Sequence, residues 1–226
     1  MERVDVRQSV LKENDRIAAE LRADFEGRAI VCLNLIGSPG AGKTTVLEHT
    51  LQALSGGPRK IAVLTGDIQT ERDAARLARF GFPARQITTG GTCHLDASMV
   101  WRALADIPLD GLDLLFIENV GNLVCPAAYD LGEEAKIVML SVAEGDDKPL
   151  KYPSIFSRAT LMLLHKMDLL PYTRFNPEAA RADARRVNPG IEIIETSCDG
   201  APGLSRWLEW IEARIAKRAA TRAQAR

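Results

Sequence analysis

The segment GSPGAGKT at residues 37–44 restricts the possible folds of this chain more than any other feature. It fits the pattern G-x-x-x-x-G-K-[ST], in which glycines let the backbone wrap around a phosphate and the next helix points its N-terminus at it. An apolar run ends at Ile36 and a helical pattern covers 45–54, which is the context that the motif requires. The expected nucleotide ligands here are Gly37, Gly40, Ala41, Gly42, Lys43, Thr44 and Thr45.

Short apolar runs alternate with helix-period segments along the rest of the chain. Strands are predicted at 29–36, 60–65, 112–118, 136–143, 160–164 and 191–196, and helices at 43–54, 71–80, 96–105, 177–187 and 203–218. The apolar runs are continuous, as is typical of strands covered on both faces. This order predicts one α/β domain over residues 1–226, with a mostly parallel, doubly wound sheet, helices on both faces and a P-loop NTPase fold.

Two segments flank the predicted sheet. Val10, Ile17, Leu21 and Phe25 share one helical face, so we expect an N-terminal helix within residues 1–28 that packs on the sheet. The basic stretch at 214–226 is expected to be a fraying helix end or a solvated tail.

Charge and hydropathy limit the partners. The 29 Lys and Arg residues nearly balance the 30 Asp and Glu residues, for a net charge of -1, so neither nucleic acid nor an anionic membrane is expected as a partner. No apolar run reaches the roughly 20 residues that span a bilayer, and the charged first residues do not fit a signal peptide. We therefore expect a cytoplasmic protein whose cysteines are free thiols or metal ligands.

Acidic residues at the ends of neighbouring strands are the expected partners of the phosphate loop. Glu118 ends the strand at 112–118, where an Asp is more usual in such proteins, and Gly121 follows at a position that can approach a γ-phosphate. Asp67 follows the strand at 60–65, where a helix N-cap and a Mg²⁺ contact are equally compatible with its position. Together with Lys43 and Thr44, Asp67 and Glu118 are the candidate catalytic residues, and Thr44, Asp67 and Glu118 are the candidate Mg²⁺ ligands.

The run His165-Lys166-Met167-Asp168 is close to the N-K-x-D element by which GTPases bind guanine. Asp168 would accept from the guanine ring N–H and amino group together, and Lys166 would lay its stem along the base. His165 replaces the usual Asn and offers one hydrogen bond rather than several, so the guanine preference is expected to be weaker.

A second base-binding loop is expected after the last strand. Ser197 and Cys198 stand at the position where a backbone N–H meets the base oxygen in GTPases, although no Lys follows them. The match is therefore weak, and Cys198 is better explained as a small loop residue.

Cys93, His94 and Cys125 are the candidate ligands of a transition metal. Cys93 and His94 are adjacent in GGTCHLDA, where paired glycines permit irregular backbone, and Cys125 lies beyond Glu118 in the segment expected to respond to the γ-phosphate. Two thiolates and an imidazole suit Zn²⁺ or Ni²⁺ and leave a coordination position open, for exchange or for a ligand from a second subunit. Cys32, inside an apolar strand, is expected in the core, and His49 on a helix surface.

In this order, the motifs resemble those of the HypB family, the nickel-insertion GTPases of hydrogenase maturation in the SIMIBI class of P-loop proteins. The matching segments are GSPGAGKT (37–44), GDIQT (66–70), GGTCHLDA (90–97), ENVGNLVCP (118–126) and DKPLKYP (147–153). The resemblance implies GTP-dependent homodimerisation, nickel or zinc held near the interface by Cys93, His94 and Cys125, and delivery of nickel to the hydrogenase large subunit with a HypA-type chaperone.

The chain also departs from that family. Its first 31 residues contain neither Cys nor His, so the N-terminal nickel-binding elements of many members are missing and a nickel reservoir is not expected. Three alternatives remain at this point: a urease-accessory GTPase, which normally presents Cys-Pro-His contiguously, a small-molecule kinase, which Asp168 disfavours, and a non-catalytic scaffold in which nucleotide only controls dimerisation.

Overall fold

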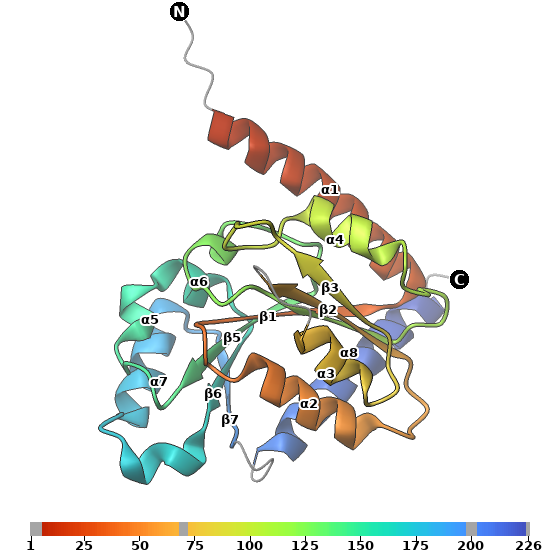
Figure 1. Ribbon diagram of the computed structural model, residues 1–226. Coiled ribbons are helices and arrows are strands. Elements are labelled where there is room, and N and C mark those ends of the chain that lie inside the picture. Colours follow the sequence, from red (N-terminus) through yellow and green to blue (C-terminus); the bar gives the residue numbers. More distant parts are fainter. Residues whose placement is uncertain (1–5, 68–71, 198–202, 225–226) are drawn as a thin grey trace, which may run out of the picture.

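The fold is built on one seven-stranded sheet with the strand order β3-β2-β4-β1-β5-β6-β7 (Figure 1). It is taken from a computed structural model that describes residues 6–67, 72–197 and 203–224. All neighbouring strands pair in parallel, which confirms the predicted doubly wound α/β fold. The strands are β1 (Val31–Gly37), β2 (Ile61–Asp67), β3 (Ala84–Thr88), β4 (Leu114–Glu118), β5 (Ala135–Ser141), β6 (Leu161–His165) and β7 (Glu192–Glu195).

Helices cover both faces of this sheet (Figure 1). One face packs against α2 (Lys43–Leu54), α3 (Arg72–Ala78) and α8 (Leu204–Gln224). The other packs against α1 (Val6–Arg28), α4 (Ala97–Leu104), α6 (Pro153–Arg158), α7 (Pro177–Val187) and the 3₁₀ turn η1 (Cys125–Ala127). The short α5 (Lys148–Lys151) and the 3₁₀ helix η2 (Met167–Tyr172) complete the connections. Because both faces are covered, β1 is buried along its whole length.

Each predicted strand is present within a few residues of its expected bounds, but β3 was not predicted. This edge strand has the sequence ARQIT, and only Ile87 in it is buried, so it lacks the apolar run that marks the other strands. The short helices α5 and α6 were also missed. They begin around Pro149 and Pro153, and both are too short for a helical period to show.

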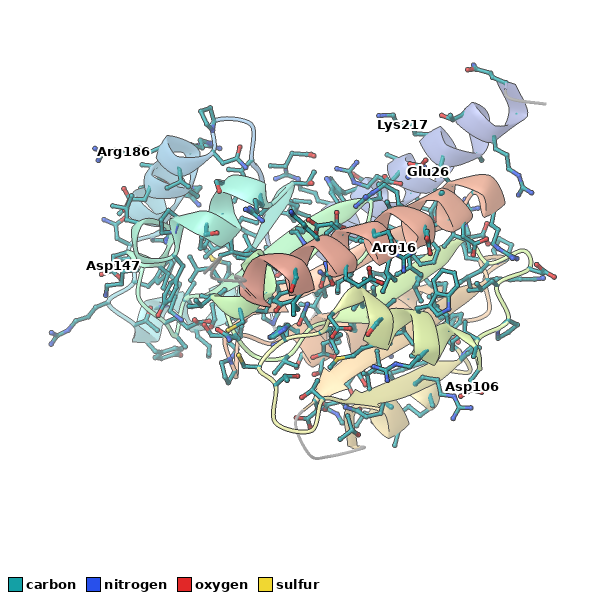
Figure 2. All side chains as sticks on the ribbon, turned by 90° about the horizontal axis from the view of Figure 1, so that it is seen from above. Arg16, Glu26, Asp106, Asp147, Arg186 and Lys217 are labelled. Atoms are coloured by element: carbon teal, nitrogen blue, oxygen red, sulfur yellow. The ribbon has the colours of Figure 1, made fainter. Side chains whose placement is uncertain are left out.

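The N-terminal helix α1 packs on the sheet and beside α4, as expected. Leu21 and Phe25 are buried, whereas Val10 is 50% exposed near the start of the helix. Figure 2 shows α1 crossing this face of the molecule, with Arg16 and Glu26 along it and the end of α8, marked by Lys217, beside its C-terminal part.

Of the two expectations for the basic stretch, a helix end and a solvated tail, the described residues show the helix. Helix α8 continues to Gln224, and the side chains of Arg214 and Arg218 are only 18% exposed. Arg218 binds the Glu134 carboxylate at 2.7 Å, and Arg214 lies over the Trp210 ring. The Glu134 carboxylate and the Trp210 ring therefore hold Arg218 and Arg214 on the domain.

Candidate functional site

The predicted site residues gather at the carboxyl ends of the parallel strands. β1 leads into the phosphate loop, β2 ends at Asp67, β4 at Glu118 and β6 at His165. β1 lies between β4 and β5, so the phosphate loop stands at the point where neighbouring strands continue to opposite faces of the sheet. Ligands usually bind at this point in such folds. A pocket of about 470 Å³ opens there, and its lining includes Gly40, Gly42, Lys43, Thr44, Thr45, Asp67, Glu118, Gly121 and Lys166.

The phosphate loop has the shape of an anion cradle. Gly42 has φ of 98°, which lets the chain turn directly into α2 at Lys43. The Lys43 ammonium is buried and donates to the carbonyl oxygens of Gly37 (3.2 Å) and Ser38 (3.5 Å). Burial lowers the pKa of Lys43. Ala41 is fully buried and Gly37 packs against Met139, so these two residues shape the loop from behind.

Thr44 and Glu118 form a hydrogen-bonded pair at the floor of the pocket. The Thr44 hydroxyl donates to Oε1 of Glu118 at 2.7 Å. Glu118 is only 5% exposed, and its Oε2 has no hydrogen-bond partner among the residues that the structure describes. Burial raises the pKa of Glu118 to about 7, against the opposing effects of Thr44 and Lys43. An orphaned carboxylate oxygen beside a hydroxyl fits a Mg²⁺ site, because hard cations bind oxygen.

Asp67 lines the same pocket at the end of β2 and is partly exposed. The residues that follow it, 68–71, lie outside the described part of the chain. Asp67 thus shares the pocket with Thr44 and Glu118, and its contact with Mg²⁺ stays a prediction.

His165 lies behind the phosphate loop. Its side chain is fully buried, Nδ1 is 2.9 Å from Oγ1 of Thr196, and the ring packs directly against Gly42. Burial and the neighbouring Lys166 lower the pKa of His165 to about 4, so its imidazole is neutral at pH 7. The ring therefore supports the phosphate loop from behind, and a contact of His165 with the base stays a prediction.

The other base-recognition residues are placed differently. Lys166 has φ of 63° and donates from Nζ to the carbonyl oxygen of Gly40 at 2.7 Å, so its stem spans the loop. Asp168 is partly exposed at the start of η2. Ser197 is 5% exposed after β7, and Cys198 lies outside the described residues.

The candidate metal ligands come together from two segments of one chain. Cys93 and His94 lie between β3 and α4, and Cys125 begins η1. One ligand atom from each lies within 4.8 Å of the others, and the two Sγ atoms are 2.9 Å apart. The His94 ring stacks on Tyr129 with centroids 3.9 Å apart, and burial lowers the pKa of His94. Its buried Nδ1 has no hydrogen-bond partner among the residues described, so the ring beside the two thiols has a nitrogen available to a metal ion.

Cys32 and His49 stand apart from this cluster, as expected. Cys32 is buried in β1, and burial raises the pKa of its thiol well above the usual value. His49 is partly buried on α2.

The pocket and the metal cluster are joined through residues 118–125. A Cβ on Gly121 would lie 3.0 Å from Pro39 of the phosphate loop. The Asn119 side chain accepts from the backbone N–H of Leu95 (3.2 Å), beside the metal ligands, and donates to Oδ1 of Asn34 (3.3 Å). This segment thus contacts both the phosphate loop and the loop that carries the metal ligands.

Sequence reasoning assigned no role to Asn119, Tyr129 or Lys148. Lys148 donates from Nζ to Oγ of Ser38 at 2.6 Å and also pairs with Glu144. The only signal for Lys148 in the sequence was its place in the motif DKPLKYP. That motif resembles one of a known family but does not indicate which atom the Lys148 side chain contacts. Tyr129 and Asn119 carried no spacing signal, because their partners are distant in the sequence.

The sheet, the phosphate loop at the end of its central strand and the acids beside it define a P-loop nucleotide-binding protein. Residues 31–195 match the family described as CobW/HypB/UreG, nucleotide-binding domain. The chain belongs to the HypB family of hydrogenase maturation factors, which confirms the resemblance noted in its motifs.

Relatives and solved structures agree with this membership. The chain is 56% identical to hydrogenase maturation factor HypB of Azotobacter chroococcum mcd 1 over 92% of its length and 68% of that protein, and 53% identical to HypB of Escherichia coli (strain K12) over 92% and 72%. Among solved structures, HypB from Helicobacter pylori in complex with nickel has a TM-score of 0.85 and 40% identity, covering 91% of this chain and 96% of that one.

More distant likeness concerns the fold alone. A LAO/AO transport system kinase aligns with a TM-score of 0.56 and 18% identity, covering 99% of this chain and 80% of that one. None of the described helices carries an apolar stretch long enough to cross a membrane.

Proposed function

We propose that this chain is a GTPase whose nucleotide state controls the binding and release of nickel during hydrogenase maturation. One observation carries the proposal: residues 118–125 contact the phosphate loop through Gly121 and Pro39, contact the metal-ligand loop through Asn119 and Leu95, and end at Cys125. A change in the phosphates at one end therefore alters the ligand geometry at the other.

The nucleotide half of the proposal rests on the pocket. The backbone of the loop and Lys43 would bind the phosphates, and Thr44, Glu118 and Asp67 would hold Mg²⁺, which neutralises charge on the phosphates when bound. Asp168 would select guanine through the ring N–H and amino group, with Ser197 and Cys198 near the base, while Lys166 spans the loop.

The cargo half rests on the cluster. The cluster supplies three soft or intermediate metal donors, from Cys93, His94 and Cys125. Three ligands leave one coordination position of the ion open, which suits an ion that is transferred rather than stored. The nickel complex of the Helicobacter pylori relative supports nickel, and Zn²⁺ is the second candidate on chemical grounds. The proposed partners are a second copy of the chain on GTP binding, a HypA-type nickel chaperone and the hydrogenase large subunit.

The test is the nickel affinity measured with GDP and with a non-hydrolysable GTP analogue. Coupling between two sites typically changes affinity about 5 to 150-fold and must be reciprocal, so nickel should change the affinity for the analogue by the same factor. Cys93→Ala should abolish nickel binding with nucleotide affinity retained. Equal nickel affinities in the two nucleotide states would overturn the proposal.

A further inference from the structure

The side chain of Asn14, on α1, joins the two segments that hold the candidate metal ligands. Its Oδ1 accepts from the backbone N–H of Ala97 at 2.8 Å, and its Nδ2 donates to the carbonyl oxygen of Asp130 at 2.9 Å. Ala97 begins α4 just after His94, and Asp130 follows the turn that begins at Cys125. Asn14 is only 5% exposed; its hydrogen bond with Ala97 is buried and the one with Asp130 is partly buried.

A second residue of α1 holds the same segment. The Arg22 guanidinium donates to both carboxylate oxygens of Asp130, at 2.6 and 2.8 Å. The residue before Asp130 is Tyr129, whose ring stacks on His94. Helix α1 therefore reaches the His94 ring through Asp130 and Tyr129, and reaches the loop of Cys93 and His94 through Ala97.

The residue type at position 14 is the one that this geometry requires. An Asn amide donates and accepts at once, whereas Asp would set a carboxylate oxygen against the Asp130 carbonyl and Leu would leave both backbone groups without a partner. Buried backbone groups that lose their partners are unfavourable, so the two segments would shift until water reached them. A shift of this kind separates ligands that now lie within 4.8 Å of one another.

We propose that Asn14 is a positioning residue for the metal site, which fixes the spacing of Cys93, His94 and Cys125 without touching the ion. The proposal rests on the proposed function, because it assumes that these residues bind nickel. It adds that α1, outside both the nucleotide pocket and the ligand set, sets the metal affinity.

The test compares Asn14→Ala with Asn188→Ala. Asn188 makes the same kind of bridge far from the cluster: it donates to the carbonyl oxygens of Phe156 (3.1 Å) and Ala159 (2.8 Å) and accepts from the N–H of Gly190 (3.1 Å). Both variants lose a side-chain amide that bridges backbone groups of separate segments, although Asn188 is only partly buried. Nickel affinity, the thiolate-to-nickel charge-transfer absorption and the affinity for a fluorescent GDP analogue are measured in the full chain.

Asn14→Ala should weaken nickel binding about 10 to 100-fold, as is usual when groups that orient metal ligands are removed, and should shift the charge-transfer band. Its affinity for the GDP analogue should stay within about twofold of wild type, and Asn188→Ala should bind nickel as wild type does. Arg22→Met, at a half-exposed site, keeps the test available if Asn14→Ala folds poorly, and should weaken nickel binding about threefold or more.

Each outcome separates the two proposals. Equal nickel affinity and an unchanged band in Asn14→Ala and Asn188→Ala overturn the positioning role. If wild type and Cys93→Ala bind nickel equally, the metal site itself is wrong and the proposed function fails with it.

Discussion

A methyl group on Gly42 would lie 2.4 Å from Cδ2 of His165, so the phosphate loop rests on the imidazole ring with no space between them. The neutral, fully buried ring is fixed on its other side by the hydroxyl of Thr196. The segment placed to recognise the base thus supports the loop placed to recognise the phosphates.

Replacing Gly42 by Ala should therefore abolish nucleotide binding and destabilise the fold. The expected loss of unfolding free energy is about 2 to 4 kcal/mol, the sum of an unfavourable positive φ and overpacking against His165. Gly56→Ala is the control, because Gly56 also has positive φ but no atom within 4 Å of the added carbon. Urea denaturation of the control should show a loss of only about 1 kcal/mol, and equal losses in both variants would contradict the contact.

Glu118 should make the stability of the nucleotide-free and Mg²⁺-free protein depend on pH. Its pKa is raised from 4.5 to about 7, so between these values the folded state keeps a proton that the unfolded state releases. The contribution of Glu118 to stability should fall as pH rises through this window, by about 3 kcal/mol in total, and level off above about 7. Below pH 4.5 the carboxyl is protonated in both states and contributes no slope.

Glu118→Gln isolates this contribution. The pH dependence that His165 contributes has the opposite sign. Its pKa is lowered from 6.5 to about 4, so its contribution to stability rises with pH between these values. Wild type and variant both contain His165, so this contribution is the same in the two proteins. The stability advantage of wild type over Glu118→Gln should therefore be larger at pH 5 than at pH 8, by about 3 kcal/mol, because the contribution of His165 cancels when the two proteins are compared at the same pH. Parallel profiles would show that Glu118 is not buried as described.

Asp168→Asn should change the base that is bound. The amide offers a donor where the carboxylate only accepts, so affinity should move from guanine toward xanthine nucleotides, by about tenfold or more in the ratio. Competition between GDP and XDP for the protein measures this ratio. Unchanged preference would remove Asp168 from base recognition and reopen a kinase interpretation.

Lys148→Met should weaken nucleotide binding. The Lys148 ammonium contacts Ser38 of the phosphate loop, so its removal takes away a positive charge and a hydrogen bond beside the expected phosphates, for a loss of about 10-fold. Lys151→Met is the matched control, since Lys151 lies on the same short helix but is 62% exposed and pairs with Asp147. Titration with a fluorescent GDP analogue should leave the control unaffected, and similar losses in both would indicate a general charge effect.

The parallel sheet and the grouping of site residues were predictable because they follow from local patterns. A buried parallel strand is recognised in the sequence as a continuous apolar run. The phosphate loop is recognised by the fixed spacing of its glycines. The edge strand β3 was missed because only Ile87 in it is buried. The spacing of Cys93, His94 and Cys125 suggested a cluster, but their approach in space follows from the pairing of β2 with β3 and β4.

The orientation of a side chain could not be predicted from the sequence where the side chain contacts a segment that is distant along the chain. His165 was expected at the base edge because its motif is read along the chain, whereas its burial depends on Gly42 and Thr196. The arginines of α8 were expected in water because acidic partners such as Glu134 come from another part of the sequence. Asn14 gave no signal for the same reason, since both its partners are contributed by other elements.

The candidate metal ligands lie beyond the carboxyl ends of the strands. The connection between α2 and β2 lies at the opposite end of the strands, where β2 begins. Gly57 in that connection is exposed, and so is Val124, which precedes Cys125 and is 61% exposed. A pair of spectroscopic probes at these two positions would report the distance between the segment before Cys125 and a fixed point at the other end of the sheet. A change in their separation on nucleotide exchange would then measure the displacement of the metal-bearing segment in isolation from the rest of the domain.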